Sequence, residues 1–157
     1  MRLRRPIYSI SIAVSLIALS ASVVYAANPH FRSVSAELGS PKLIISAVEV
    51  GLGSGTTVTY EASASVTTTA QCINGGSQNP SASNKVSSGE VDASATATAD
   101  ASGKITIEFI LPALPPDFCP PGQGTLIVTA TFTNVTLTDT TNGIVASIPG
   151  TFVYNAT

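Results

Sequence analysis

Residues 126–137, Leu-Ile-Val-Thr-Ala-Thr-Phe-Thr-Asn-Val-Thr-Leu, contain the pattern that decides the fold. Up to Thr133 every second residue is apolar and the residues between them are mainly threonines, as in a β-strand with one buried face. The apolar residues of this alternation are Leu126, Val128, Ala130 and Phe132. After Asn134 the apolar residues, Val135 and Leu137, have the opposite parity. A shift of one residue turns every side chain to the other face, so the pattern predicts a β-bulge near Thr133-Asn134 or a strand that crosses between two sheets.

The same period-2 alternation recurs along the chain from residue 27 onward, and no window has the periodicity of an amphipathic helix. The predicted strands cover residues 42–50, 56–70, 91–99, 104–111, 126–137 and 144–154. Turn-forming residues separate them, and Pro149-Gly150 interrupts the last strand. We expect Asp100-Ala101-Ser102-Gly103 to be a tight hairpin connection between the strands 91–99 and 104–111. Counting interrupted strands separately, we expect about seven.

Without a helix to cover it, a single sheet could not bury a face, so the strands predict two antiparallel sheets packed as a sandwich. We expect an immunoglobulin-like Greek key, with a small β-barrel as the alternative. The length of 157 residues suits one domain. We assign residues 42–157 to this domain and residues 27–41 to a flexible segment before it.

Residues 1–26 have the layout of a secretory signal peptide. Three arginines precede a mostly apolar stretch, and Val24-Tyr25-Ala26 offers small residues at the −3 and −1 positions of a cleavage site. The alternative is a retained membrane anchor, because the apolar stretch approaches spanning length. We expect cleavage, a secreted protein and no stable membrane insertion afterwards.

The charge of residues 27–157 limits the class of partner. Four basic and nine acidic residues give a formal charge of −5, and no basic cluster is present. Nucleic acid and anionic membranes are therefore poor candidates. The two cysteines, Cys72 and Cys119, predict a disulfide in an oxidising compartment, since two ligands cannot complete a structural zinc site.

Three segments together resemble a family of small exported proteins found in actinobacteria and other soil bacteria. They are Cys-Ile-Asn-Gly-Gly (72–76), Cys-Pro-Pro-Gly-Gln (119–123) and Asp-Thr-Thr-Asn-Gly (139–143). The resemblance covers roughly residues 42–154. It implies export, the disulfide and one β-sandwich domain, but it implies no activity or substrate.

The residues do not predict a catalytic or metal site, and we expect no cofactor. The single histidine, His30, is a poor partner for a serine nucleophile, and a Ser-Lys pair is a weaker alternative. A glycosidase needs two carboxylates in a cleft. Seven carboxylates are candidates for this role, and we expect most of them to face solvent: Glu49, Glu61, Glu90, Asp92, Glu108, Asp117 and Asp139.

Two further motifs have simple structural explanations. Asp139-Thr-Thr-Asn-Gly143 offers oxygen ligands for calcium, but these are also common turn residues, and we expect a turn. Thr129, Thr131 and Thr133 form a row like those of ice-binding surfaces, although solvent-facing strands commonly carry such threonines.

Loops joined by the disulfide are the predicted binding surface, because pre-ordered loops suit recognition. The candidate residues are Asn74, Gln78, Asn79, Asn84, Leu114, Asp117, Phe118 and Gln123. We expect a non-enzymatic binding or structural module, associated with carbohydrate or a surface protein. The alternatives are a protease inhibitor that presents residues 112–121 and an enzyme acting on polysaccharide.

Overall fold

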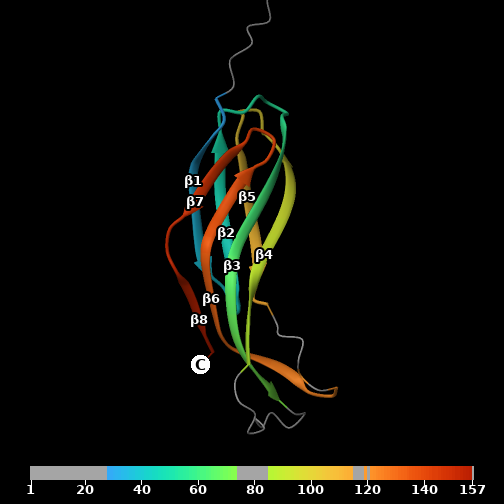
Figure 1. Ribbon diagram of the computed structural model, residues 1–157. Helices are drawn as coiled ribbons and strands as arrows, with labels where there is room; N and C mark the ends of the chain where they lie inside the picture. Colours follow the sequence, from blue (N-terminus) through green and yellow to red (C-terminus); the bar gives the residue numbers. More distant parts are fainter. Residues whose placement is uncertain (1–27, 74–84, 115–118, 120, 157) are drawn as a thin grey trace, which may run out of the picture.

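The computed structural model describes residues 28–73, 85–114, 119 and 121–156 (Figure 1). In this part of the chain the regular structure consists of eight strands, with no helix. Their bounds are β1 His30–Leu38, β2 Lys42–Val50, β3 Thr57–Ile73, β4 Lys85–Thr98, β5 Ile105–Pro112, β6 Gly124–Asp139, β7 Ile144–Ile148 and β8 Phe152–Asn155. No helix able to cross a membrane occurs among these residues.

The strands form two antiparallel sheets packed face to face, as the alternation predicts. Sheet A has the order β1-β2-β5, and sheet B has the order β4-β3-β6-β7, with β8 also paired to β6. The chain passes from sheet A to sheet B between β2 and β3 and returns between β4 and β5. This order gives the expected Greek-key sandwich, with β4 at an edge of the sheet that contains β3 and β6. In Figure 1 the long strands β3 and β6 extend past the other strands at the lower end.

Alternating side chains from both sheets form one core. The inward-facing side chains include Leu43 and Ile45 from β2, Tyr60 from β3, and Phe109 and Leu111 from β5, all nearly inaccessible to solvent. The inward parity predicted for β4 is correct, because its alanines lie in or against the core while the alternate residues are exposed. The small alanines allow close packing of the facing sheet.

The phase change in β6 is a β-bulge, as predicted. Ser63 of β3 pairs with Thr136, whereas Ser65 pairs with Thr133, so β6 contains one extra residue between these pairs. Asn134 lies there with a φ of 52°, in the left-handed region that asparagine tolerates better than most residues. Phe132, Val135 and Leu137 are all buried as a result.

A second bulge in β6 corrects the expectation for its first residues. Thr69 pairs with Thr129, but Ala70 pairs with Ile127, which leaves Val128 as the extra residue. The parity therefore changes again. Ile127 packs against the core, whereas Leu126 is 40% exposed instead of facing inward.

The segment 27–41 is not simply a flexible extension, because most of it forms β1. Residues His30–Leu38 pair with β2 along its length, from His30 opposite Val50 to Leu38 opposite Leu43. Phe31, Val34 and Ala36 pack against the core. The domain boundary predicted at residue 42 is therefore wrong, since sheet A includes β1. The expected signal peptide, residues 1–26, lies outside the described residues.

The Asp100–Gly103 turn connects the sheets at one end of the sandwich. Gly103 N–H donates to the Asp100 carbonyl at 3.0 Å, and Asp100 Oδ1 accepts from the Ser102 and Lys104 amides. The turn is where the sequence predicts it. However, it joins β4 of sheet B to β5 of sheet A instead of two paired strands.

Candidate functional site

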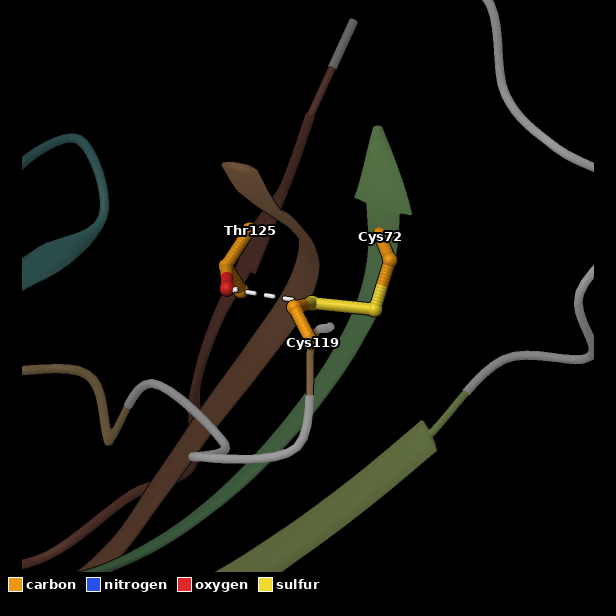
Figure 2. The surroundings of a disulfide bond; sticks show 3 residues. All are labelled: Cys72, Cys119 and Thr125. Carbon is orange, nitrogen blue, oxygen red and sulfur yellow. Dashed lines mark hydrogen bonds between the residues drawn. A yellow bond between two sulfur atoms is a disulfide. The ribbon is translucent and has the colours of Figure 1, made fainter. Parts of the chain in front are cut away.

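The predicted disulfide is present between Cys72 and Cys119, whose Cα atoms are 5.5 Å apart. Cys72 lies near the end of β3, and Cys119 belongs to the connection between β5 and β6 (Figure 2). Thr125 Oγ1, near the start of β6, donates a hydrogen bond to Cys119 Sγ at 3.3 Å. The bridge therefore joins Cys119 to the end of β3, one of the two strands that extend past the others at the lower end of the sandwich (Figure 1).

Most of the predicted binding surface lies outside the described residues, namely Asn74, Gln78, Asn79, Asn84, Asp117 and Phe118. Gln123 is half-buried before β6. Leu114 packs against the core, and its side chain approaches Gly89 of β4. Leu114 thus has a structural role. The binding surface at the disulfide end, and the inhibitor loop 112–121, stay predictions.

Two of the seven candidate carboxylates, Glu49 and Asp139, are buried rather than solvent-facing. Their exposed fractions are 1% and 0%. The sequence contains the signal for this burial: Glu49 has the parity of Leu43, Ile45 and Ala47, and Asp139 has that of Val135 and Leu137. A polymeric substrate could not reach carboxylates enclosed in this way.

The segment 139–143 forms the expected turn. Asp139 Oδ1 accepts hydrogen bonds from the Thr141 and Asn142 amides, at 2.8 and 2.9 Å, and Asp139 Oδ2 accepts one from Asn142 Nδ2. The carboxylate thus organises its own turn. Among the described residues, no group of three or more His, Cys, Asp or Glu side chains is arranged to hold a metal ion.

The outer face of sheet B carries an array of serine and threonine side chains, here called the hydroxyl face. It comprises Thr57, Thr59, Ser63, Ser65, Thr67 and Thr69 of β3, Ser88, Ser94, Thr96 and Thr98 of β4, Thr129, Thr131, Thr133, Thr136 and Thr138 of β6, and Ser147 of β7. The predicted row of three threonines in β6 is one column of this array. Cross-strand register places hydroxyls side by side in rows, for example Ser88, Thr67 and Thr131.

Neighbouring hydroxyls on this face hydrogen-bond to one another. The Oγ1 atoms of Thr57 and Thr98 are 3.3 Å apart, as are those of Thr59 and Thr96. Thr67 Oγ1 lies 3.0 Å from Ser88 Oγ, and Ser63 Oγ lies 2.8 Å from Thr136 Oγ1. These pairs orient the hydroxyl groups, and each hydroxyl retains further capacity to donate or accept.

An open hollow of about 510 Å³ lies where the hydroxyl face meets the break between β7 and β8. Its lining residues are Asn134, Thr136, Ser147, Ile148, Pro149 and Gly150. Thr136 and Ser147 are paired across β6 and β7 and belong to the hydroxyl face as well. The bulge creates one wall, because it turns Asn134 outward, and Asn134 Nδ2 donates to Ser65 Oγ at 3.3 Å.

The hollow combines an amide, two hydroxyls and an apolar rim, with no ionisable side chain in its lining. Groups of this kind bind an uncharged, hydroxyl-rich ligand by hydrogen bonds and apolar contact. The sequence predicts the bulge near Asn134 and the interruption at Pro149-Gly150. It does not show that the two lie close together, because their proximity depends on the pairing of β7 and β8 with β6.

Comparisons with known proteins identified no relative: no family model, curated protein or solved structure matches the chain. The resemblance to an exported bacterial family thus stays a prediction.

Proposed function

We propose that the protein is a secreted, non-enzymatic module that binds neutral polysaccharide through the hydroxyl face and the adjoining hollow. The observation that carries this proposal is the continuity of the two features: Thr136 and Ser147 line the hollow and also belong to the hydroxyl face. A chain of sugar units could therefore enter the hollow with one unit and lie across the face with the next. The disulfide supports export, because such bonds persist in oxidising compartments.

The charge distribution favours an uncharged ligand. The acidic residues on the outer face of sheet B are Glu61, Glu90 and Asp92, and all three are exposed. Glu61 lies beside Ser94, and Asp92 lies beside Ser63, so these carboxylates share the middle of the face. An anionic polysaccharide would be repelled there, whereas a neutral one would find hydrogen-bond acceptors.

The shape of the face favours a single flexible glycan over a flat crystalline surface. Adjacent strands of a sheet are rotated relative to one another by about 20–25°, so rows of side chains do not lie in one plane. β3 and β6 are long, and two bulges in β6 further interrupt the regularity of the face. The array is thus poorly matched to an ice plane despite its threonine content.

Within the hollow, Pro149 and Ile148 offer apolar contact to the face of a sugar ring, and Asn134, Thr136 and Ser147 offer hydrogen bonds. Each hydrogen bond contributes only about 0.5–1.5 kcal/mol net. Useful affinity therefore requires several units of the glycan to bind at once, which an extended face provides.

Affinity electrophoresis in gels containing soluble polysaccharides tests the proposal. We expect retardation by a neutral glucan or mannan and none by a polyuronate. The double variant Thr136→Val, Ser147→Ala should lose about tenfold or more in affinity, because it removes two hydroxyls at about 1 kcal/mol each.

Thr106→Val is the matched control, since Thr106 is an exposed threonine of β5 in sheet A. It should leave retardation unchanged. Absence of retardation by every neutral glycan tested, or equal loss in the control and the double variant, would refute the proposal.

A further inference from the structure

A buried cluster of three ionisable side chains connects the two sheets. Glu49 lies on β2 of sheet A, and Tyr60 and Asp139 are cross-strand partners on β3 and β6 of sheet B. Their exposed fractions are between 0% and 1%. Tyr60 Oη donates to Glu49 Oε2 at 2.6 Å, so a direct hydrogen bond crosses the interface between the sheets.

The two carboxyl groups have different surroundings. Asp139 accepts three hydrogen bonds from the turn that follows it, two of them from backbone amides. Glu49 accepts the hydrogen bond from Tyr60 at Oε2, whereas its Oε1 is buried with no hydrogen-bond donor near it. A buried carboxylate oxygen without a donor is costly, and a proton on that oxygen removes the cost.

We propose that Glu49 is held as a neutral acid whose Oε1 proton is shared with the Asp139 carboxylate, so that the cluster is a pH-sensitive clasp between the two sheets. In this arrangement the Tyr60 hydroxyl donates to Glu49 and Glu49 donates to Asp139. Each buried oxygen then has a partner, and the pair carries one negative charge rather than two.

The electrostatics of the surroundings agree with this arrangement. Burial raises the pKa of Glu49, and the negative charge of Asp139 and its hydrogen bonding with Glu49 raise it further. The Tyr60 hydrogen bond and the charge of His30 on β1 lower this pKa, but they do not reverse the effect. Ile105, the partner of Glu49 on β5, brings no ionisable group. Within the described part of the chain, the titratable groups that act on Glu49 are thus Tyr60, Asp139 and His30.

The sign of the pH dependence follows from the raised pKa. Glu49 ionises in the unfolded chain at a pKa of about 4.3, and in the folded protein it ionises only at higher pH. Its contribution to stability is complete below the unfolded pKa and is lost as the pH rises through the folded pKa. Between these limits the folded state holds up to one more proton, so the unfolding equilibrium constant increases by up to tenfold per pH unit.

Denaturant unfolding of the full-length protein at a series of pH values tests the clasp. We expect the Glu49→Gln variant to lose this component of the pH dependence, because glutamine is a permanently neutral replacement whose amide can donate to Asp139. Glu108→Gln, at an exposed position of β5, is the control and should keep the wild-type dependence. Equal pH dependence of wild type and Glu49→Gln would overturn the proposal.

Infrared spectroscopy of the unaltered protein provides a second test that does not require the variant to fold. The carbonyl stretch of a protonated carboxylic acid should persist at neutral pH. Its absence at neutral pH would also overturn the proposal.

Discussion

Gly103 lies directly against the backbone of Leu52, so that the turn between β4 and β5 contacts the segment between β2 and β3. Leu52 N–H donates to the Gly103 carbonyl at 3.1 Å, and a β-carbon at Gly103 would overlap the Leu52 carbonyl oxygen. Gly103 also has a φ of +73°. Both the close approach and the left-handed backbone therefore require glycine at this position.

We expect Gly103→Ala to destabilise the protein by more than the roughly 1–2 kcal/mol that a left-handed conformation costs an alanine. The excess would come from displacement of Leu52. Gly55 separates the two causes, because its φ is +75° but nothing lies within 4 Å of an added β-carbon. Gly55→Ala should cost only the conformational term. Equal losses in the two variants, measured by denaturant unfolding, would contradict the importance of the contact.

In a regular strand Thr131 and Leu137 would lie on the same face, but the bulge at Asn134 turns Leu137 into the core. The two positions should therefore differ in how much a charged substitution destabilises the protein. Phe132 and Leu137 are both fully buried although their parities differ, whereas Thr131 faces outward. Phe132→Asp and Leu137→Asp should each cost several kcal/mol, about 3 or more, because each buries an unpaired charge. Thr131→Asp should be mild. Thermal unfolding of the three variants decides the matter, and tolerance of Leu137→Asp would contradict the burial on both sides of the bulge.

The second bulge predicts a difference between two adjacent apolar residues. Ile127 packs against the core, and Leu126 is exposed. Ile127→Ala should therefore lose about 2 kcal/mol, near the lower end of the range for large-to-small core substitutions, and Leu126→Ala should lose well under 1 kcal/mol. The reverse order in urea unfolding would show that the strand keeps one parity through Val128.

The disulfide should contribute a large part of the stability. A cross-link between residues separated by 47 positions is worth about 4 kcal/mol in the chain-entropy model. The Cys72→Ala, Cys119→Ala double variant should show a corresponding loss in unfolding free energy. Native protein should contain no thiol that an alkylating reagent can modify before reduction and two such thiols after it. Modification of both cysteines in unreduced protein would contradict the bridge.

The sequence predicts those features of the fold that depend on the alternation of neighbouring residues. The inward faces of β4 and β5 and the bulge at Asn134 are of this kind. The sequence does not predict β1, because His-Phe-Arg-Ser-Val-Ser-Ala-Glu-Leu contains few large apolar residues and is stabilised by pairing with β2. It does not predict the second bulge either, because Leu126, Ile127 and Val128 are all apolar and show no alternation.

The candidate site depends on contacts between distant parts of the chain and was harder to predict. The parity of Glu49 and Asp139 indicates burial, but only the packing of the sheets brings Tyr60 to Glu49. Similarly, the hydroxyl face follows from cross-strand register, which joins threonines more than 60 positions apart, such as Thr67 and Thr131. The threonines along β6 are visible in the sequence, whereas the hydroxyls beside them on β3 become apparent only in the sheet.

The disulfide also determines how the molecule would respond to mechanical force. If the chain is pulled from its two ends, tension passes through the sulfur atoms from Cys72 to Cys119 and bypasses the residues between them. β4 and β5 lie entirely within this bypassed segment. At about 3.4 Å per residue, the bridge withholds roughly 160 Å of chain from extension. Reduction would release that length, so the fully extended chain should be roughly 160 Å longer in the reduced protein than in the oxidised one.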